Sequence, residues 1–238
     1  MKQLPLLIPG TPCHDAASFL HGESNAAARA WLDRTESWPD RRLALWGAGA
    51  RGKTHLLRIW CARTGADYLE GAALTGFPAL PSARGVAVDD ADRADESALL
   101  HLLNAARDVD CPGECPVGGP VGGPVGCPGG CPVLLAASAP PARWTVALPD
   151  LASRLRAMTA VEIAAPDDDL LRRLLLRLLT EHRLSAEPAL HEWLLTRLPR
   201  NPEALRAAVA RLDHDALVSR RRTVSPAMLR AALPGEEG

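Results

Sequence analysis

The sequence predicts an α/β domain built on a parallel sheet, followed by a smaller all-helical domain. Three short apolar runs are typical of buried strands, and they span residues 43–46, 85–88 and 132–137. Segments with helical spacing follow the first two runs, at residues 53–64 and 96–107. Because strands and helices alternate along this part of the chain, we expect a parallel sheet with helices on both faces.

After Pro166 the pattern changes to helices alone. Four segments have helical spacing with no strand candidate between them: residues 167–182, 187–198, 202–219 and 226–233. Three of them begin with residues typical of helix N-termini: Asp167, Asn201 and Ser225. We therefore expect an extended tail over residues 1–14, the α/β domain over 15–165 and a helical lid domain over 166–238.

Charge and composition argue against two classes of protein. Lys and Arg number 27 against 28 Asp and Glu, so the net charge of −1 provides no polycationic field for holding nucleic acid non-specifically. No apolar run approaches the roughly 18 residues of a membrane helix, and the first dozen residues lack the apolar core of a signal peptide. We expect a cytoplasmic protein without membrane contact.

A glycine-rich loop follows the first predicted strand. The string G-A-G-A-R-G-K-T at residues 47–54 has the Walker A spacing, with a strand before it and a helix after it. Backbone N–H groups at Gly47, Gly49 and Gly52 are expected to surround phosphate oxygens, while Lys53 reaches the β and γ phosphates. Thr54 is expected to ligate Mg²⁺, so the loop predicts a site for ATP or ADP.

Two acidic residues end the second predicted strand. A P-loop site needs a carboxylate on a neighbouring strand to hold the Mg²⁺ shell, and Asp89 is expected to fill this role. Asp90 stands where many ATPases place a glutamate that activates water. An aspartate is one methylene shorter, so hydrolysis in cis is expected to be weak. Without the Walker A loop, such a pair would be interpreted as a helix cap or a solvated turn.

Four motifs together resemble the DnaA-type AAA+ proteins. They are F-L-H-G-E-S-N at residues 19–25, G-A-R-G-K-T-H-L at 49–56, V-D-D at 88–90 and L-P-D-L-A-S-R-L at 148–155. The resemblance spans nearly the whole chain, and it is closest to the short homologues that lack a DNA-binding domain and inactivate DnaA. It implies the AAA+ fold, in which the parallel sheet is followed by a helical lid.

The resemblance assigns an arginine finger to Arg154, in the L-P-D-L-A-S-R-L motif. Such an arginine reaches the nucleotide of a neighbouring molecule and neutralises the charge that develops during phosphoryl transfer. The resemblance implies that this neighbouring molecule is DnaA. A homo-oligomer is also compatible with the motif. The alternative on residue chemistry alone is an arginine that caps helix carbonyls or pairs with Asp150.

Two nucleotide-sensing positions depart from the family. Ser138 matches the sensor-1 position, where the family usually has a more strongly polar or acidic residue. The sensor-2 arginine is expected near Pro202 and Glu203, but the chain has Arg206 one turn later. Arg206 lies on the same helix face, so it substitutes for the family arginine or is simply a surface residue. Both departures favour a stably ADP-bound protein with little hydrolysis of its own.

The N-terminal tail resembles a peptide that docks on the β sliding clamp of DNA polymerase III. Gln3 supplies an amide, and Leu4, Leu6 and Leu7 supply apolar anchors for a groove. The alternative for so short a match is a disordered tail. Docking on the clamp would make the contact with DNA indirect.

A low-complexity loop at residues 111–132 carries four of the six cysteines. Their C-x3-C spacings admit a zinc site, but the P-V-G-G repeat and the lack of histidine favour a loop without metal. The basic run at residues 220–222 is typical of a solvated turn, with a phosphate or DNA contact as the alternative.

The sequence thus favours a regulatory inactivator of the replication initiator DnaA. It is expected to be nucleotide-bound and docked on the clamp, and to stimulate hydrolysis of the ATP on DnaA through Arg154. The alternatives are a self-sufficient AAA+ ATPase that uses Asp90, and a DnaA-like replication initiation factor or loader. The latter is disfavoured by the lack of a helix-turn-helix segment after the lid.

Overall fold

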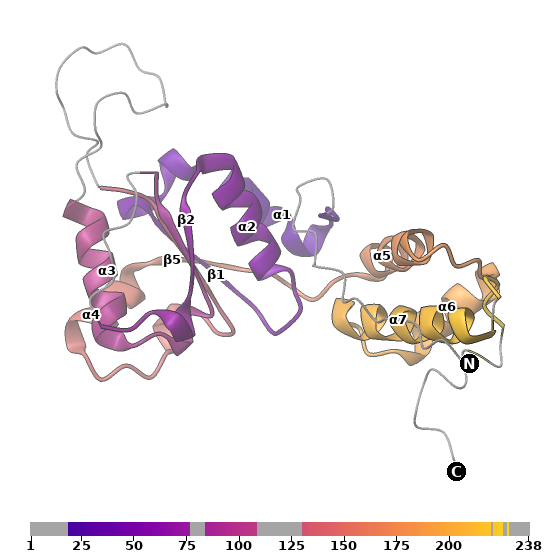
Figure 1. The fold of residues 1–238 in the computed structure, drawn as a ribbon. Coiled ribbons are helices and arrows are strands. Elements are labelled where there is room, and N and C mark those ends of the chain that lie inside the picture. The colour runs from indigo at the N-terminus through magenta and orange to yellow at the C-terminus, as the bar shows by residue number, and fades with distance from the viewer. Residues whose placement is uncertain (1–18, 77–83, 109–129, 220, 226–227, 229–238) are drawn as a thin grey trace. The chain divides into compact units, whose positions relative to one another are not determined.

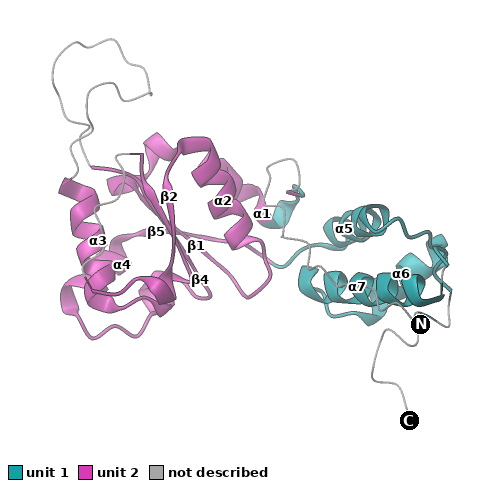
Figure 2. Ribbon diagram, in the orientation of Figure 1, with its two compact units in different colours: residues 1–13, 20–24, 165–238 teal, residues 14–19, 25–164 magenta. Residues whose placement is uncertain are grey.

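The computed structural model describes residues 19–76, 84–108, 130–219, 221–225 and 228. The chain forms two compact units (Figure 2). An α/β unit contains residues 25–164 with Phe19, and a helical unit contains residues 165 onward with residues 20–24. None of the helices in the described ranges is both long and apolar enough to cross a membrane.

The α/β unit is built on a five-stranded parallel sheet in the order β2-β3-β4-β1-β5. The strands are β1 (Arg42–Trp46), β2 (Asp67–Glu70), β3 (Val86–Asp89), β4 (Val133–Ala137) and β5 (Thr159–Glu162). The three predicted strands are the three central ones, and every residue of β3 and β4 is buried. The edge strands β2 and β5 escape the apolar-run criterion, because most of their residues are at least partly exposed.

Helices cover both faces of this sheet, as the sequence predicts (Figure 1). They are α1 (Glu23–Leu32), α2 (Lys53–Thr64), α3 (Glu96–Asp108) and α4 (Pro149–Ala157). One apolar cluster joins α3 and α4 to the sheet, and a second joins α1 and α2 to its other face. Short 3-10 helices complete the unit: η2 (Thr35–Ser37), η3 (Pro39–Arg41), η4 (Gly71–Ala73), η5 (Ala91–Arg93) and η6 (Pro141–Arg143).

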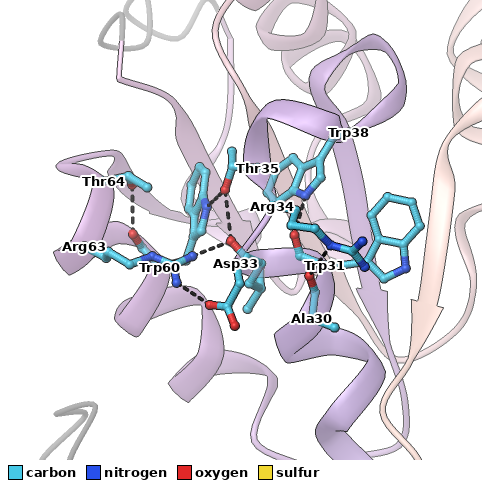
Figure 3. Close-up of polar contacts among 10 residues, drawn as sticks. Ala30, Trp31, Asp33, Arg34, Thr35, Trp38, Trp60, Arg63 and Thr64 are labelled. Carbon is cyan, nitrogen blue, oxygen red and sulfur yellow. Dashed lines mark hydrogen bonds and ion pairs between the residues drawn. The ribbon is translucent and has the colours of Figure 1, made fainter. Parts of the chain in front are cut away.

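A pair of tryptophans packs the segment between α1 and β1 against helix α2 (Figure 3). The rings of Trp38 and Trp60 stack with their centroids 5.5 Å apart, and both side chains are buried. Trp60 donates its indole N–H to the Thr35 hydroxyl at 2.9 Å, and Trp38 donates to the Trp31 carbonyl at 2.8 Å. Because both indole N–H groups are satisfied, these rings can be buried beside the helix that starts at the glycine-rich loop.

The helical unit contains α5 (Asp168–Glu181), α6 (Pro188–Arg197) and α7 (Pro202–Ser219), packed around a leucine-rich core. The predicted caps form: Asp167 accepts the amide of Leu170 at 2.6 Å, and Asn201 accepts that of Ala204 at 2.6 Å. Most of the fourth predicted helix, 226–233, lies outside the described residues.

The basic run at residues 220–222 contributes to the helical unit itself. Arg222 donates to the Asp213 carboxylate at 3.0 Å, and that carboxylate also bonds His182 at 3.0 Å. Residue 220 lies outside the described ranges. The intramolecular ion pair of Arg222 argues against a nucleic-acid contact by this residue, because an engaged guanidinium must first be released to bind phosphate.

Candidate functional site

The glycine-rich loop joins β1 to α2 at the carboxyl end of β1, which lies between β4 and β5 in the sheet. A Cβ atom at Gly47 would lie 2.6 Å from the carbonyl oxygen of Ile163, so only glycine fits there. Gly52 has a φ of 90°, in the left-handed region that favours glycine, and lies against the Phe19 ring. At Gly49, an added Cβ would meet no atom of the described residues within 4 Å, so packing does not require this glycine.

Lys53 lies folded over the loop. Its ammonium donates to the carbonyls of Gly47 at 2.7 Å and Ala48 at 2.9 Å, and the residue is 8% exposed. Thr54 follows in the first turn of α2 and is half-buried. A buried ammonium inside a glycine loop, at the positive end of a helix, suits a polyphosphate. These residues therefore fit the phosphates of ADP or ATP.

The charges of three carboxylates, at the end of β3 and in the segment after it, affect the pKa of Lys53. Burial lowers the pKa of Lys53, and the carboxylates of Asp90, Asp89 and Asp92 act in the opposite direction. The loop lysine and both predicted acidic residues are thus close enough to interact electrostatically, as is Asp92, which the sequence reasoning missed. The sequence signal that could have identified Asp92 is its position two residues after Asp90.

Asp89 is buried and held by two donors. The Tyr68 hydroxyl donates to its carboxylate at 2.9 Å, and the backbone N–H of Asp90 donates at 3.1 Å. In the described ranges no cluster of three or more His, Cys, Asp or Glu residues could hold a metal. A Mg²⁺ ion at a P-loop uses few protein ligands, with phosphate and water completing its shell, so Thr54 and Asp89 remain the predicted pair.

Asp90 adopts a left-handed conformation with φ 45° and ψ 46°, which is uncommon for a residue other than glycine. A Cβ atom at Gly71 would lie 2.2 Å from the Asp90 carbonyl oxygen, so Gly71 lets the chain pass at this point. The Asp90 side chain is exposed, with the Arg93 guanidinium 4.0 Å away. Asp90 is thus exposed to solvent, and its role in orienting water stays a prediction.

Ser138, at the end of β4, is bonded to the same acidic segment. Asp92 accepts its backbone N–H at 3.2 Å and its hydroxyl at 2.5 Å. The serine therefore donates its proton to a carboxylate of its own chain. The weak phosphate sensing that we expect from a serine at this position stays a prediction.

Known structures share this architecture, although no family model and no curated protein sequence matches the chain. Domain III of the Thermotoga maritima replication initiation protein DnaA is 14% identical, with a TM-score of 0.66, over 94% of this chain and 96% of that domain. A single-residue variant of Thermotoga maritima RuvB is 13% identical, with a TM-score of 0.65, over 92% of this chain and 70% of its own. The replication initiator DnaA bound to AMPPCP and single-stranded DNA is 15% identical, with a TM-score of 0.60, over 84% and 64%.

The chain has the AAA+ P-loop fold. The fold class predicted from the sequence is thereby confirmed, with the parallel sheet, the loop after β1 and the helical unit. The neighbours are AAA+ proteins that include DnaA. At 13–15% identity, the likeness is one of fold alone.

Arg154 lies in the second turn of α4, in the AAA+ α/β unit. Its Nε donates to the Asp150 carboxylate at 3.2 and 3.3 Å, so the pairing named as an alternative in the sequence analysis does form. Burial lowers the pKa of Arg42, at the start of β1, and the nearby charge of Arg154 lowers it further. Arg154 is on the helix that leads into the amino end of β5, whereas the glycine-rich loop follows the carboxyl end of β1.

The remaining predicted residues belong to the helical unit or lie outside the described residues. Arg206 is on α7, in the helical unit, where burial lowers the pKa of its guanidinium and the carboxylates of Glu181 and Glu203 act in the opposite direction. The four tail residues predicted to bind the clamp, Gln3, Leu4, Leu6 and Leu7, lie outside the described residues.

One of the four cysteines in the zinc interpretation, Cys131, is poorly suited to be a metal ligand. Cys131 is 2% exposed and belongs to the apolar cluster beneath α3, with its N–H bonded to the Ala106 carbonyl at 2.8 Å. The other three cysteines, at 111, 115 and 127, lie outside the described residues. A thiol buried among leucines and valines is poorly placed to share a metal with a surface loop.

Tyr68 gives a pH-dependent readout of the Asp89 carboxylate. Burial, followed by the charge of Asp89, raises the pKa of Tyr68 from 10.0 to about 12. The folded protein keeps a proton that the unfolded chain loses, so this contribution to stability is complete below pH 10 and disappears as the pH rises through about 12.

Because Tyr68 is the single tyrosine of the chain, its ionisation can be followed by ultraviolet difference absorbance. At pH 11, with folding checked by circular dichroism, we expect only about a tenth of it to be ionised. Asp89→Asn should lower its pKa toward 10. An ordinary pKa in the wild type would contradict the contact.

Proposed function

We propose that this protein is a regulatory inactivator of DnaA, most like the homologue Hda. In this proposal it holds ADP or ATP with Mg²⁺ at residues 47–54 and docks on the DNA polymerase III sliding clamp. It then offers Arg154 to ATP bound by DnaA, promotes hydrolysis and so limits replication initiation. The fold shared with DnaA domain III and the phosphate-binding geometry around Lys53 support this proposal.

The position of Arg154 carries the proposal. Helix α4 leads directly into β5, whose residue Thr159 pairs with Leu43 near the start of β1. The loop around Lys53 begins at the other end of β1, after Trp46. Because all the strands are parallel, the end of α4 and the loop around Lys53 lie at opposite ends of the sheet. This placement supports a role for Arg154 toward a nucleotide held by another molecule.

The chemistry expected of Arg154 follows from its charge. When water attacks the γ-phosphorus of ATP, the bond to the β-phosphate oxygen breaks, and ADP and inorganic phosphate leave. Negative charge on the transferred group is stabilised by a nearby guanidinium, which is worth about 10³ to 10⁵ in rate in systems that use one. The pair with Asp150 is made through Nε, so the two terminal nitrogens are outside this pair.

A self-sufficient ATPase is the second candidate, because the negative charges of Asp89 and Asp90 both raise the pKa of Lys53, against the effect of burial. It would require Asp90 to orient water in cis, while Ser138 is engaged by Asp92. Steady-state turnover by the isolated protein, lost in Asp90→Asn, would support this candidate. A DnaA-like initiation factor or loader would instead bind DNA tightly without the clamp.

Binding to the clamp separates the replication proposal from a generic ATPase. We expect immobilised clamp to retain the wild-type protein, whereas Gln3→Ala/Leu6→Ala should be lost, because the amide and one apolar anchor are removed together. Lys2→Ala, at a neighbouring position outside the motif, is the matched control and should still be retained. Equal retention of all three proteins would contradict docking through the tail.

A further inference from the structure

The N-terminus of α4 is held by a carboxylate from another helix. Glu96, the first residue of α3, accepts the backbone N–H of Ala147 at 3.0 Å through each oxygen, and that of Leu148 at 2.9 Å. Leu148 is the N-cap of α4 and provides no side-chain cap, and Pro149 has no N–H. Glu96 therefore supplies the acceptor, and the negative charge, that the start of α4 lacks.

The connection from β4 to α4 is fixed at its other end by the same segment. Asp92, four residues before Glu96, holds Ser138 through its N–H and its hydroxyl. Between these two points, the Trp144 indole donates to the Ala139 carbonyl at 2.8 Å. The chain that follows β3 thus holds both the beginning and the end of the connection that leads to α4.

The position of Arg154 depends on this attachment. Helix α4 has nine residues, with Asp150 in its first turn and Arg154 four residues later. Since Asp150 bonds the Arg154 guanidinium, both residues move with the helix axis. A displacement of the first turn would shift the guanidinium with it, and misplacement by about 1 Å can cost on the order of 100-fold in rate.

We infer that Glu96 is a positioning residue for Arg154, acting through its two backbone contacts at the N-terminus of α4. The inference rests on the proposed action of Arg154 in trans and adds a residue that contacts neither nucleotide. The Glu96 carboxylate bonds the backbone of residues 147 and 148 and not the loop of residues 47–54, so its replacement should lower the maximal stimulation of DnaA and leave nucleotide affinity unchanged.

The test compares Glu96→Ala and Glu96→Gln with Asp95→Ala in the full-length protein. Asp95 is a matched control, because it caps α3 by accepting the amide of Ala98 at 2.9 Å and does not bond α4. Hydrogen exchange of the Ala147 and Leu148 amides reports the attachment. The maximal rate of DnaA-bound ATP hydrolysis, and the protein concentration that gives half of it, report the function.

For Glu96→Ala we expect both amides to exchange about tenfold faster or more, since each loses a bond to a charged acceptor. The maximal rate should fall at least tenfold, while the half-saturating concentration stays within twofold. Glu96→Gln keeps one amide oxygen as an acceptor and should fall between Glu96→Ala and the wild type. Asp95→Ala should keep the wild-type rate and wild-type exchange at both amides.

Unchanged exchange in both Glu96 variants would overturn the inference, and so would faster exchange with a wild-type maximal rate. If Glu96→Ala fails to fold, the same two readouts on Glu96→Gln decide. Arg154→Ala is measured alongside. If that variant stimulates DnaA normally, the proposed function itself fails, while amide exchange still shows whether Glu96 holds α4.

Discussion

Replacing Lys53 with alanine is expected to weaken the binding of ADP and ATP by about 30- to 160-fold. The ammonium is buried inside the loop and aligned by the carbonyls of Gly47 and Ala48. A charge-assisted contact of this kind contributes about 2 to 3 kcal/mol, which gives the stated range. The other groups expected to contact the phosphates are backbone N–H groups, which the substitution leaves in place. The variant should therefore fold and bind nucleotide only weakly, and isothermal titration calorimetry can measure this affinity.

Arg58→Ala is the matched control for this variant. Arg58 lies on the same helix, is exposed and places its guanidinium 4.6 Å from the centre of the Tyr68 ring. Its loss should leave nucleotide affinity within about twofold, since no phosphate contact is expected there. Equal affinities for wild type and Lys53→Ala would show that the loop is a structural turn.

Replacing Arg154 with alanine is expected to abolish the stimulation of DnaA-bound ATP hydrolysis, a loss of about 10³-fold or more. The helix that carries this side chain leads into the amino end of β5, away from the glycine-rich loop, so the protein's own nucleotide affinity should not change. Clamp binding should also persist, because the predicted docking peptide is a separate segment of the chain. Phosphate release from DnaA-ATP, in the presence of clamp on DNA, gives the rate.

Arg156→Ala controls for loss of a positive charge from the same helix. Arg156 is exposed and donates to the Ala152 carbonyl at 3.0 Å, one turn back along α4. We expect this variant to stimulate DnaA like the wild type. A similar loss in both variants would indicate a general electrostatic effect of α4 and would contradict a specific role for Arg154.

The fold was predictable wherever the signal is local. Apolar runs identify β1, β3 and β4 because the centre of a parallel sheet is buried on both faces. At the edges, D-Y-L-E in β2 and T-A-V-E in β5 carry few buried residues, so these strands are recognisable only by their partners. Capping chemistry correctly placed the starts of α5 and α7 for the same local reason.

The sequence predicts the candidate site residues that occur at fixed spacings in a motif. It does not predict the residues that hold them in place. The loop ending in Lys53 and the acidic pair at the end of β3 follow from spacing alone. Tyr68, Asp92 and Glu96 act through contacts to residues 21, 46 and about 50 positions away in the sequence. Such contacts depend on strand order and on the return of the chain to the sheet, which no local pattern encodes.

The most direct test of the central claim is a single-turnover measurement on labelled ATP preloaded on DnaA. The protein described here is loaded with AMPPCP, which it cannot hydrolyse, so all released phosphate comes from DnaA. With clamp on DNA present, the account predicts rapid release with wild-type protein and basal release with Arg154→Ala. Equal release with the two proteins, or no acceleration by the wild type, would contradict an arginine that acts in trans.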